Sequence, residues 1–536
     1  MGSDSKNAKG KQIIIYLFLI LSLGLYLRIS NLGLPSFNRD ELNHVFAAKA
    51  LLEQNKPLLP SNISYKRGIF VSKLISYLFH YFGISEFFAR LPSVIFGCLS
   101  IFALFILGSW LCNPYVGLTS ALFLSLSPQS IFISRFARMY APLQFFYILL
   151  ILFFYKGFEN NSKKNAAINL IIALFLLYVC ISLQIISFTF MPSIAVYVFC
   201  MCFLYFWKNG FFKIYKNRYF ITMLLILFFG FIISAFRTDQ VVKLFDKSQI
   251  VLMWAQNNAS NIYYYWHRLG DKYSLLLPFL PISLLIALLN YKRRGVYITC
   301  LFVVPFLFHS VIFKTKSERF ISYFLPILFI LFAIMLVFII KNGYLFLTRS
   351  LAEFIKDNRR LRIISISITV LLVMFCLGRD QWVKKGFVIH TIREGFIDGF
   401  PHDGWREGGD YLKKNIKDED IIITASSLSA LYYVGRADYN CNEADKRIMV
   451  QQSKRKPNIL LNKDGCIKDY YGGLIYIKSL DELIEIYKRH KSGWIIYDTL
   501  RFKPLSEGIK KFVENTFVRH ELPNTSTIRI YSWGRD

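Results

Sequence analysis

Long apolar runs dominate the first 378 residues of this 536-residue chain. About eleven of them are long enough to cross the roughly 30 Å of hydrocarbon in a bilayer. They lie near 13–29, 90–111, 115–133, 141–157, 165–182, 185–207, 219–236, 274–290, 296–313, 321–341 and 361–378. This pattern predicts a polytopic α-helical membrane protein whose main solvent is the bilayer.

The composition agrees with a membrane protein and argues against nucleic-acid binding. Aromatic residues make up 17% of the chain, with 52 Phe and 32 Tyr. Packing in lipid and in interfacial belts accounts for them without a cofactor or base stacking. We expect the formal net charge of +30 to lie mainly in cytoplasmic loops and near anionic headgroups, with some left for an anionic substrate.

The basic residues predict the orientation. The N-terminal segment 1–12 is polar and basic, lacks a following cleavage site, and is expected to stay cytoplasmic. With this end inside, cytoplasmic loops carry Lys156, Lys163 and Lys164; Lys208, Lys213, Lys216 and Arg218; Lys292, Arg293 and Arg294; and Arg349, Lys356, Arg359, Arg360 and Arg362. Segments 30–89, 134–140, 237–273 and 314–320, and all residues after 379, are then expected on the non-cytoplasmic face of the plasma or inner membrane.

Two amphipathic pieces are expected to lie at the membrane surface within segment 30–89. ELNHVFAAKALLEQ, at 41–54, places its apolar residues along one helical face. IFVSKLISYLFHYFG, at 69–83, is short for a span and carries Lys73 and His80. Treating it as a span would reverse every later loop and place the basic loops outside, so we expect a juxtamembrane helix.

The composition changes after 379 to that of a soluble domain. Segments 474–478, 479–490 and 493–499 predict strand, helix and strand, and Ser479 with Glu482 predicts a capping box. The chain therefore divides into a transmembrane domain, 1–378, and an external α/β domain, 379–536. The external domain has no nucleotide-binding or metal-binding motif. It contains Cys441 and Cys466, for which a disulfide and two free thiols are both open.

Asp40 and Glu41 follow the first span directly and are the candidate catalytic carboxylates. A carboxylate at the membrane surface can take the proton of an acceptor hydroxyl as that hydroxyl attacks an anomeric carbon. The alternative is that Asn38 or Asp40 simply caps the interfacial helix. Asp40 can serve as both cap and base, because a helix N-terminus favours the ionised carboxylate that a base requires.

Basic residues also gather in three non-cytoplasmic segments, where the positive-inside rule leads us to expect few. They are Lys66 and Arg67; Arg135 and Arg138; and Lys314, Lys316 and Arg319. A leaving lipid phosphate needs cations rather than a proton donor, so these residues are candidates to bind it. The alternative for each is snorkelling or pairing with headgroups.

Segment 237–273 is long enough to cover a site and contains Arg237, Lys243, Asp246, Trp254 and Arg268. Its YYYWHR run is more typical of an interfacial aromatic belt than of a sugar platform. His44, His267 and His309 lack metal-ligand spacing, so no His-based metal site is predicted.

In these motifs the chain resembles the GT-C membrane glycosyltransferases, in the branch of protein O-mannosyltransferases and the lipid A aminoarabinose transferase. Asp40-Glu41 matches the acidic pair, and Arg67 stands where relatives often have Lys before Pro, with Gly68 replacing that proline. Further matches are Gly83 with Arg90, Leu91 and Pro92; Arg138 with Tyr140; and Lys316 and Arg319 with Tyr323 and Pro326. Tyr140 stands where some relatives have an aspartate.

The resemblance implies a GT-C fold and a single inverting displacement of sugar from a polyprenyl phosphate. It implies that Asp40 is the base, that Glu41 positions the acceptor or the basic residues, and that Arg67, Arg138, Lys316 and Arg319 hold the carrier phosphate beside Tyr323. Lys66, Arg135, Tyr140, Arg237 and Arg268 are secondary candidates. With few carboxylates in these motifs, we expect no metal and no cofactor besides the lipid-linked donor.

Two other functions share some of these features. A transporter or flippase for the same lipids would share the basic clusters, but it predicts ionisable residues in mid-span and internal repeats. A non-catalytic scaffold would bind a partner through its external domain. The sugar and the acceptor, whether protein, lipid or glycan, are not encoded in these motifs.

Overall fold

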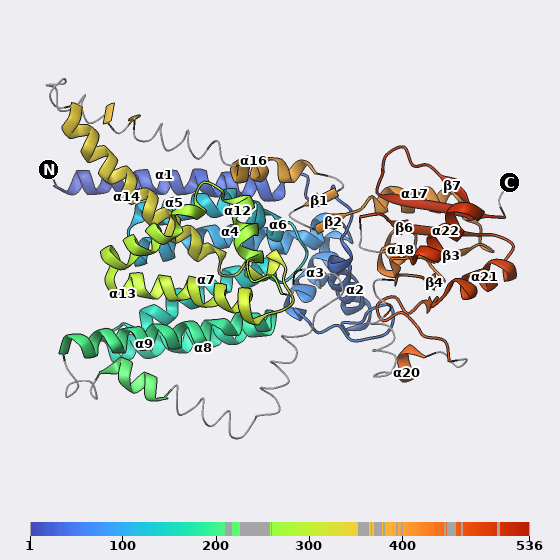
Figure 1. Cartoon of the computed structure of the whole chain (residues 1–536), viewed down its shortest axis with the longest axis horizontal. Coiled ribbons are helices and arrows are strands. Elements are labelled where there is room, and N and C mark those ends of the chain that lie inside the picture. The colour runs from blue at the N-terminus through green and yellow to red at the C-terminus, as the bar shows by residue number, and fades with distance from the viewer. Residues whose placement is uncertain are drawn as a thin grey trace. The chain divides into compact units, whose positions relative to one another are not determined.

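The computed structural model describes residues 2–209, 217–225, 258, 260–351, 364–365, 367–368, 378, 381–392, 395–397, 400–443, 446, 457–461, 465–500 and 504–534. The chain forms two compact units that do not follow chain order (Figure 1). The helical unit comprises residues 1–28, 95–133 and 140–388, and the mixed unit comprises residues 29–94, 134–139 and 389–536. The predicted boundary at 379 itself lies outside the described residues.

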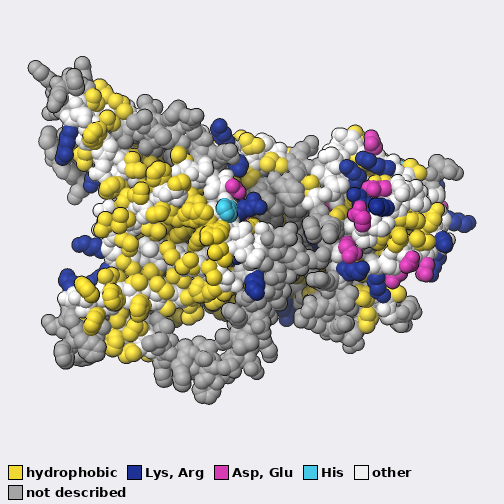
Figure 2. All heavy atoms as spheres, viewed as in Figure 1, with side chains coloured by type: hydrophobic (Ala, Val, Ile, Leu, Met, Phe, Trp, Pro, Cys, Tyr) yellow, Lys and Arg dark blue, Asp and Glu magenta, His cyan; other side chains and the backbone are white. Residues whose placement is uncertain are grey.

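Seven helical segments are long and apolar enough to cross a membrane, among the residues described. They are Gly10–Ile29, Glu86–Leu111, Tyr140–Phe158, Lys163–Leu183, Ile185–Lys208, Leu277–Ile312 and Leu325–Leu351. Large apolar side chains stay exposed on them, including Phe175, Tyr178 and Phe199, at 63%, 71% and 59%. Hydrophobic side chains likewise cover much of the visible face of the helical unit (Figure 2). Such exposed apolar surface is stable only in lipid, so the chain is an integral membrane protein.

The helices of these segments are labelled α1 (Gly2–Ile29), α4 (Glu86–Leu111), α7 (Tyr140–Phe158), α8 (Lys163–Leu183), α9 (Phe190–Asn209), α13 (Leu280–Leu307) and α14 (Leu325–Leu351). Shorter elements of the helical unit are α12 (Tyr264–Lys272), α16 (Gln381–Val388), and the one-turn elements η1 (Ile185–Thr189), η4 (Leu277–Phe279), η5 (Phe308–Ile312) and η6 (Glu318–Ile321).

The predicted span at 115–133 is broken. Helices α5 (Pro114–Leu126) and α6 (Pro128–Ser134) meet at an angle of 66°. Pro128 has no N–H to continue the hydrogen-bonded ladder, and its ring disfavours helical backbone at Ser127, which is extended with ψ 118°. The sequence therefore contained the signal for the break.

The predicted spans 274–290 and 296–313 are the two legs of a helical hairpin within α13. The backbone leaves the helix at Lys292, where φ is 48°. A Cβ built on Gly295 would lie 2.0 Å from the carbonyl oxygen of Ala287, eight positions earlier. A straight helix would hold these residues roughly 12 Å apart, so the chain reverses here and Gly295 permits the close approach. The predicted spans 219–236 and 361–378 lie largely outside the described residues.

The mixed unit begins with the first interhelical segment. Helices α2 (Arg39–Gln54) and α3 (Ile69–Phe82) pack against each other, and both are too short to span a bilayer, as predicted. Within the mixed unit, side-chain contacts join residues 29–94 to the C-terminal residues. Arg406 pairs with Glu86 at 2.6 Å, and the Tyr433 hydroxyl accepts from the Phe37 N–H at 2.6 Å. Residues 30–89 and the C-terminal domain must therefore lie on one side of the membrane.

The C-terminal domain is built on a six-stranded sheet in the order β5-β4-β3-β6-β8-β7. Strands β3 (Ile421–Thr424), β4 (Tyr439–Asn440), β5 (Ile475–Tyr476) and β6 (Gly493–Asp498) run parallel to one another. Strand β8 (Ile528–Trp533) pairs antiparallel with both β6 and β7 (Val518–His520). Helices are α17 (Trp405–Asn415), α18 (Ser427–Tyr433), α20 (Pro457–Leu460), α21 (Leu480–Arg489) and α22 (Glu507–Thr516). A separate hairpin pairs β1 (Gly395–Ile397) with β2 (Phe400–His402).

The core of this domain lies between the sheet and the pair α21 and α22. Ile423 and Ile495 from the central strands pack with Leu483 and Val513, all of them fully buried. The predicted strand, helix and strand over 474–499 is confirmed, and the Ser479 side chain caps α21 by accepting from the Glu482 N–H. Cys441 and Cys466 are both free thiols.

Candidate active site

Glu41 and Arg90 form a buried ion pair in the mixed unit. Each Glu41 oxygen lies 2.8 Å from a nitrogen of Arg90, and neither side chain is more than 1% exposed. The remaining Arg90 N–H groups donate to the carbonyls of Leu32, Pro35 and Ser36, so all five donors are satisfied. Burial alone raises the pKa of Glu41, but the Arg90 charge and hydrogen bonds hold it below its ordinary value.

The Glu41 carboxylate also binds two backbone N–H groups, from Asn38 and Ala137, both at 2.9 Å. The bond to Asn38 completes a capping box at the start of α2, since the Asn38 side chain accepts from the Asp40 N–H at 2.9 Å. Asn38 therefore caps the helix, and the Asp40 side chain is not needed for that purpose. Asp40 lies in the first turn, partly exposed.

Arg138 is brought to Asp40 by the same carboxylate. Glu41 holds the N–H of Ala137, the residue before Arg138, while Asp40 is the residue before Glu41. The guanidinium of Arg138 donates to the Asp40 carbonyl at 2.7 Å and to the Tyr65 hydroxyl at 3.2 Å. A predicted base and a predicted phosphate ligand therefore lie side by side in one unit.

His44 is a residue of this site that the sequence analysis considered only as a metal ligand. It lies one turn after Asp40 on α2, is fully buried, and contacts the Ser72 hydroxyl through Nδ1 at 2.9 Å. Its Nε2 has no hydrogen-bond partner among the described residues. Burial, together with the charges of Arg138 and Arg67, holds the pKa of His44 well below its ordinary value, so the ring is neutral.

The other predicted cations of the mixed unit differ in burial. Lys66 and Arg67 are exposed and lead into Gly68, whose φ of +59° excludes the proline that relatives carry there. Arg135 donates to the carbonyls of Ser30 and Asn31 just after α1. Burial lowers the pKa of Arg135 to about 10, and its contacts are those of a helix-end cation.

In the helical unit, Lys316 is 2% exposed and its ammonium donates to three carbonyls. These belong to Ser310 at 2.6 Å and to His309 and Phe313 at 3.3 Å. Burial lowers the pKa of Lys316. The buried Tyr323 hydroxyl contacts His309 Nε2 at 3.1 Å, while Arg319 is partly exposed.

Glu318, which was not among the predicted site residues, forms ion pairs with two cations near this loop. It is 8% exposed, forms an ion pair with Lys272, and lies 3.4 Å from Arg268. Arg268 is thus bound to a carboxylate. Tyr140 begins α7 with a buried hydroxyl that lacks a partner among the described residues, and Arg237 lies outside the described residues.

Groups of three or more His, Cys, Asp or Glu side chains that could hold a metal are absent from the part of the chain that the structure describes. Metal independence stays a prediction. The arrangement in the mixed unit is that of a carboxylate beside guanidinium groups at a helix N-terminus, which suits proton transfer next to an anion.

Solved structures similar to this chain belong to GT-C glycosyltransferases. ArnT from Cupriavidus metallidurans matches in its apo state, with a TM-score of 0.60 and 12% identity over 98% of each chain. ArnT bound to undecaprenyl phosphate matches with a TM-score of 0.60 and 13% identity, over 96% of this chain and 98% of ArnT.

A second relative in structure is the archaeal oligosaccharyltransferase AglB from Archaeoglobus fulgidus, in complex with an inhibitory peptide and a dolichol-phosphate. It matches with a TM-score of 0.60 and 12% identity, over 91% of this chain and 70% of AglB. No family model matches the sequence, and the search of curated proteins found no match to it. At these identities the likeness shows the fold: the chain has the GT-C fold.

Proposed function

We propose, on the premise of the GT-C fold, that this chain transfers a sugar from a polyprenyl-phosphate carrier to a protein, lipid or glycan. The solved neighbours support the donor class, since ArnT has been seen with undecaprenyl phosphate and AglB with a dolichol-phosphate. The observation that carries the proposal is the Glu41–Arg90 pair. The pair is buried and all of its donors are bound, so Glu41 acts as the positioning carboxylate, and Asp40, the other member of the acidic pair, acts as base.

The reaction is a single inverting displacement. The acceptor oxygen forms a bond to the anomeric carbon while the bond from that carbon to the carrier phosphate breaks. Asp40 takes the acceptor proton, and the polyprenyl phosphate leaves with the bonding electrons. The N-terminus of α2 favours the ionised form of Asp40 that a base requires.

The cations proposed to hold the phosphate are the four that the family resemblance implies. In the mixed unit they are Arg138, which is held at the Asp40 carbonyl, and the exposed Arg67. In the helical unit they are Lys316 and Arg319, with Tyr323 beside them in the chain. Charge at these positions would stabilise the developing phosphate anion without donating a proton. The reaction is proposed to occur on the non-cytoplasmic face.

Mass spectrometry of glycans, lipids and proteins from cells with and without this chain tests the proposal. We expect a glycosylated product to disappear without the chain, to return with the natural chain, and to stay absent with Asp40→Asn. A flippase would instead restore the product with Asp40→Asn. No product difference between cells with and without the chain would refute the transferase.

A further inference from the structure

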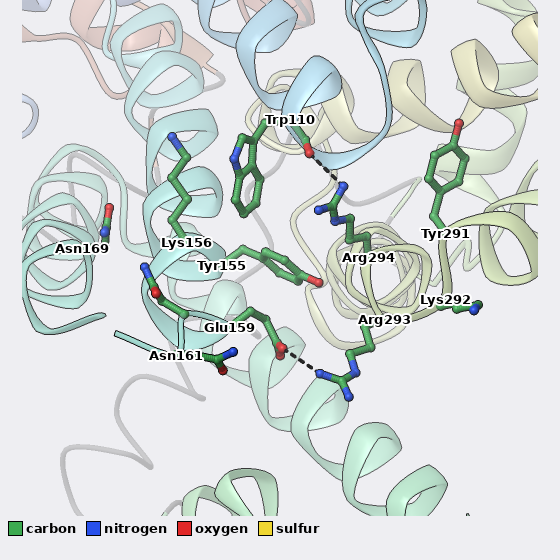
Figure 3. A pocket seen from close by; sticks show the side chains of 11 residues that line it. Trp110, Tyr155, Lys156, Glu159, Asn161, Asn169, Tyr291, Lys292, Arg293 and Arg294 are labelled. Carbon is green, nitrogen blue, oxygen red and sulfur yellow. Dashed lines mark hydrogen bonds and ion pairs between the residues drawn. The ribbon is translucent and has the colours of Figure 1, made fainter. Parts of the chain in front are cut away.

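The helical unit has a polar pocket of about 720 Å³ that the proposed transfer does not use (Figure 3). It is lined by the end of α4, the end of α7, the first turns of α8 and the turn of the α13 hairpin. Its charged side chains are Lys156, Glu159, Lys292, Arg293 and Arg294. All of its cations come from loops that the positive-inside rule places in the cytoplasm.

The pocket has more positive charge than its one acid can balance. Glu159 is already bound, because the hydroxyls of Tyr197 and Tyr219 each donate to it at 2.7 Å and Arg293 pairs with it at 3.6 Å. Lys156 and Lys292 take part in no ion pair within the described residues. An anion that enters the pocket therefore meets charge that no described carboxylate neutralises.

Two of the cations converge on Trp110. The Lys156 ammonium lies 5.4 Å and the Arg294 guanidinium 5.5 Å from the centre of the indole ring. Arg294 is fixed there by hydrogen bonds to the carbonyls of Trp110 and Leu111, at 3.2 and 3.4 Å. Figure 3 shows the two cations on either side of the ring. Both cations line the pocket, so each adds to the positive charge that an entering anion meets.

The pocket is separate from the predicted phosphate ligands near Lys316. The second leg of the α13 hairpin and η5 run from Arg294 to Ile312. At 1.5 Å per residue this path is roughly 27 Å, close to the thickness of the hydrocarbon core. The pocket and Lys316 therefore lie at opposite ends of one span.

Apolar side chains continue from the pocket along the same helices. On α8, Ile168 and Ile171 are 48% and 66% exposed; on α13, Leu285 and Leu289 are 55% and 69% exposed. A ligand with an anionic head and apolar tails would match both surfaces at once. We propose that this pocket binds the phosphate of an anionic phospholipid from the cytoplasmic leaflet.

Native mass spectrometry of the full-length protein in detergent tests this, with phosphatidylglycerol, phosphatidylcholine or inorganic phosphate added. Lys156→Gln removes a cation that makes no hydrogen bond or ion pair among the described residues, so the fold should be kept. We expect phosphatidylglycerol binding to weaken by roughly fivefold in Lys156→Gln and further in Lys156→Gln/Arg294→Gln. The matched control, Lys163→Gln/Lys164→Gln, removes two exposed charges at the start of α8 and should change binding little.

Three results would overturn the proposal. One is equal binding of phosphatidylglycerol by the natural chain and by the Lys156 and Arg294 variants. Another is an equal loss in the Lys163/Lys164 control, since that would indicate a diffuse charge effect. The third is that phosphatidylcholine binds as tightly as phosphatidylglycerol, or that inorganic phosphate displaces phosphatidylglycerol as effectively as added phosphatidylglycerol does. In either case the pocket would not select an anionic lipid.

Discussion

The carboxylate of Glu41 is clamped by Nε and Nη2 of Arg90 at 2.8 Å each, with both side chains shut off from solvent. Because Glu41 also holds the N–H groups of Asn38 and Ala137, the pair joins the start of α2, the start of α4 and the 134–139 turn. Asp40 and Arg138 each stand next to a residue fixed in this way. A buried ion pair thus sets the distance between the proposed base and a proposed phosphate ligand.

Glu41→Gln is expected to destabilise the protein by about 3–5 kcal/mol, because it leaves the Arg90 charge buried without its partner. Melting in detergent, followed by tryptophan fluorescence, measures the change. The control is Glu53→Gln on the same helix, where a half-exposed pair with Lys49 at 3.9 Å should be worth less than about 1 kcal/mol. A loss no larger than in the control would mean that the pair does not hold the site.

Lys316→Ala should weaken donor binding by about tenfold or more, because it removes a cation that meets the phosphate in the ground state. The KM for the donor measures this. Lys314, exposed in the same loop, supplies the matched variant Lys314→Ala. Because its ammonium donates to three backbone carbonyls, Lys316 could instead have a purely structural role in holding this loop. A lower melting temperature with an unchanged KM would favour that role.

The helical spans and the strand–helix–strand of the C-terminal domain were predictable because their patterns are local. Ser127-Pro128 and Gly295 also carried local signals of a break and of a close approach, which a search for apolar runs alone overlooks. The pairing of Glu41 with Arg90 was not readable, because 49 positions separate them and only the folded loop brings them together.

Asp40 and Arg138 were both predicted as site residues through the family resemblance, and the Arg138 guanidinium lies 2.7 Å from the Asp40 carbonyl. Glu41 was predicted to position the acceptor or the basic residues, and its carboxylate binds Arg90 and the N–H of the residue before Arg138. His44 could have been found, since a residue four positions after Asp40 lies on the same helical face. Glu318 could not, because its role depends on Lys272 and Arg268 from a different segment.

A reporter fused after residue 160 or 294 should score cytoplasmic, and one after residue 400 should score external. The contacts of Arg406 with Glu86 and of Tyr433 with Phe37 require the C-terminal domain to share the compartment of residues 30–89. A cytoplasmic score after 400 would place Asp40 inside as well. It would contradict a reaction on the non-cytoplasmic face.

Acid should destabilise the mixed unit between about pH 6.5 and pH 4. Burial lowers the pKa of His402 to about 4, and burial with nearby Arg138 and Arg67 lowers that of His44. Both rings are neutral when folded, whereas the unfolded chain binds protons below its ordinary pKa of about 6.5. Stability is therefore full above that pH and falls as the pH drops, by up to about 1.4 kcal/mol per pH unit for each His.

Melting temperatures at several pH values measure this effect. His44→Gln and His402→Gln should each flatten the decline, while His80→Gln, at an exposed position of α3, should leave it unchanged. An equally steep decline in the double variant His44→Gln/His402→Gln would assign the acid sensitivity to other groups.

Asp40→Asn is expected to lower the rate of transfer by roughly 10²-fold or more while donor binding and melting temperature stay normal. Asn keeps the size of the side chain but cannot take the acceptor proton. The helix start should survive, because Asn38 and Glu41 form the capping box and neither is changed. Turnover measured at saturating donor separates this effect from that of Arg138→Ala, which should raise the donor KM. Normal turnover by Asp40→Asn would show that Asp40 is not the base. Glu41 could not take its place without breaking its bonds to Arg90, and the proposed mechanism would fail.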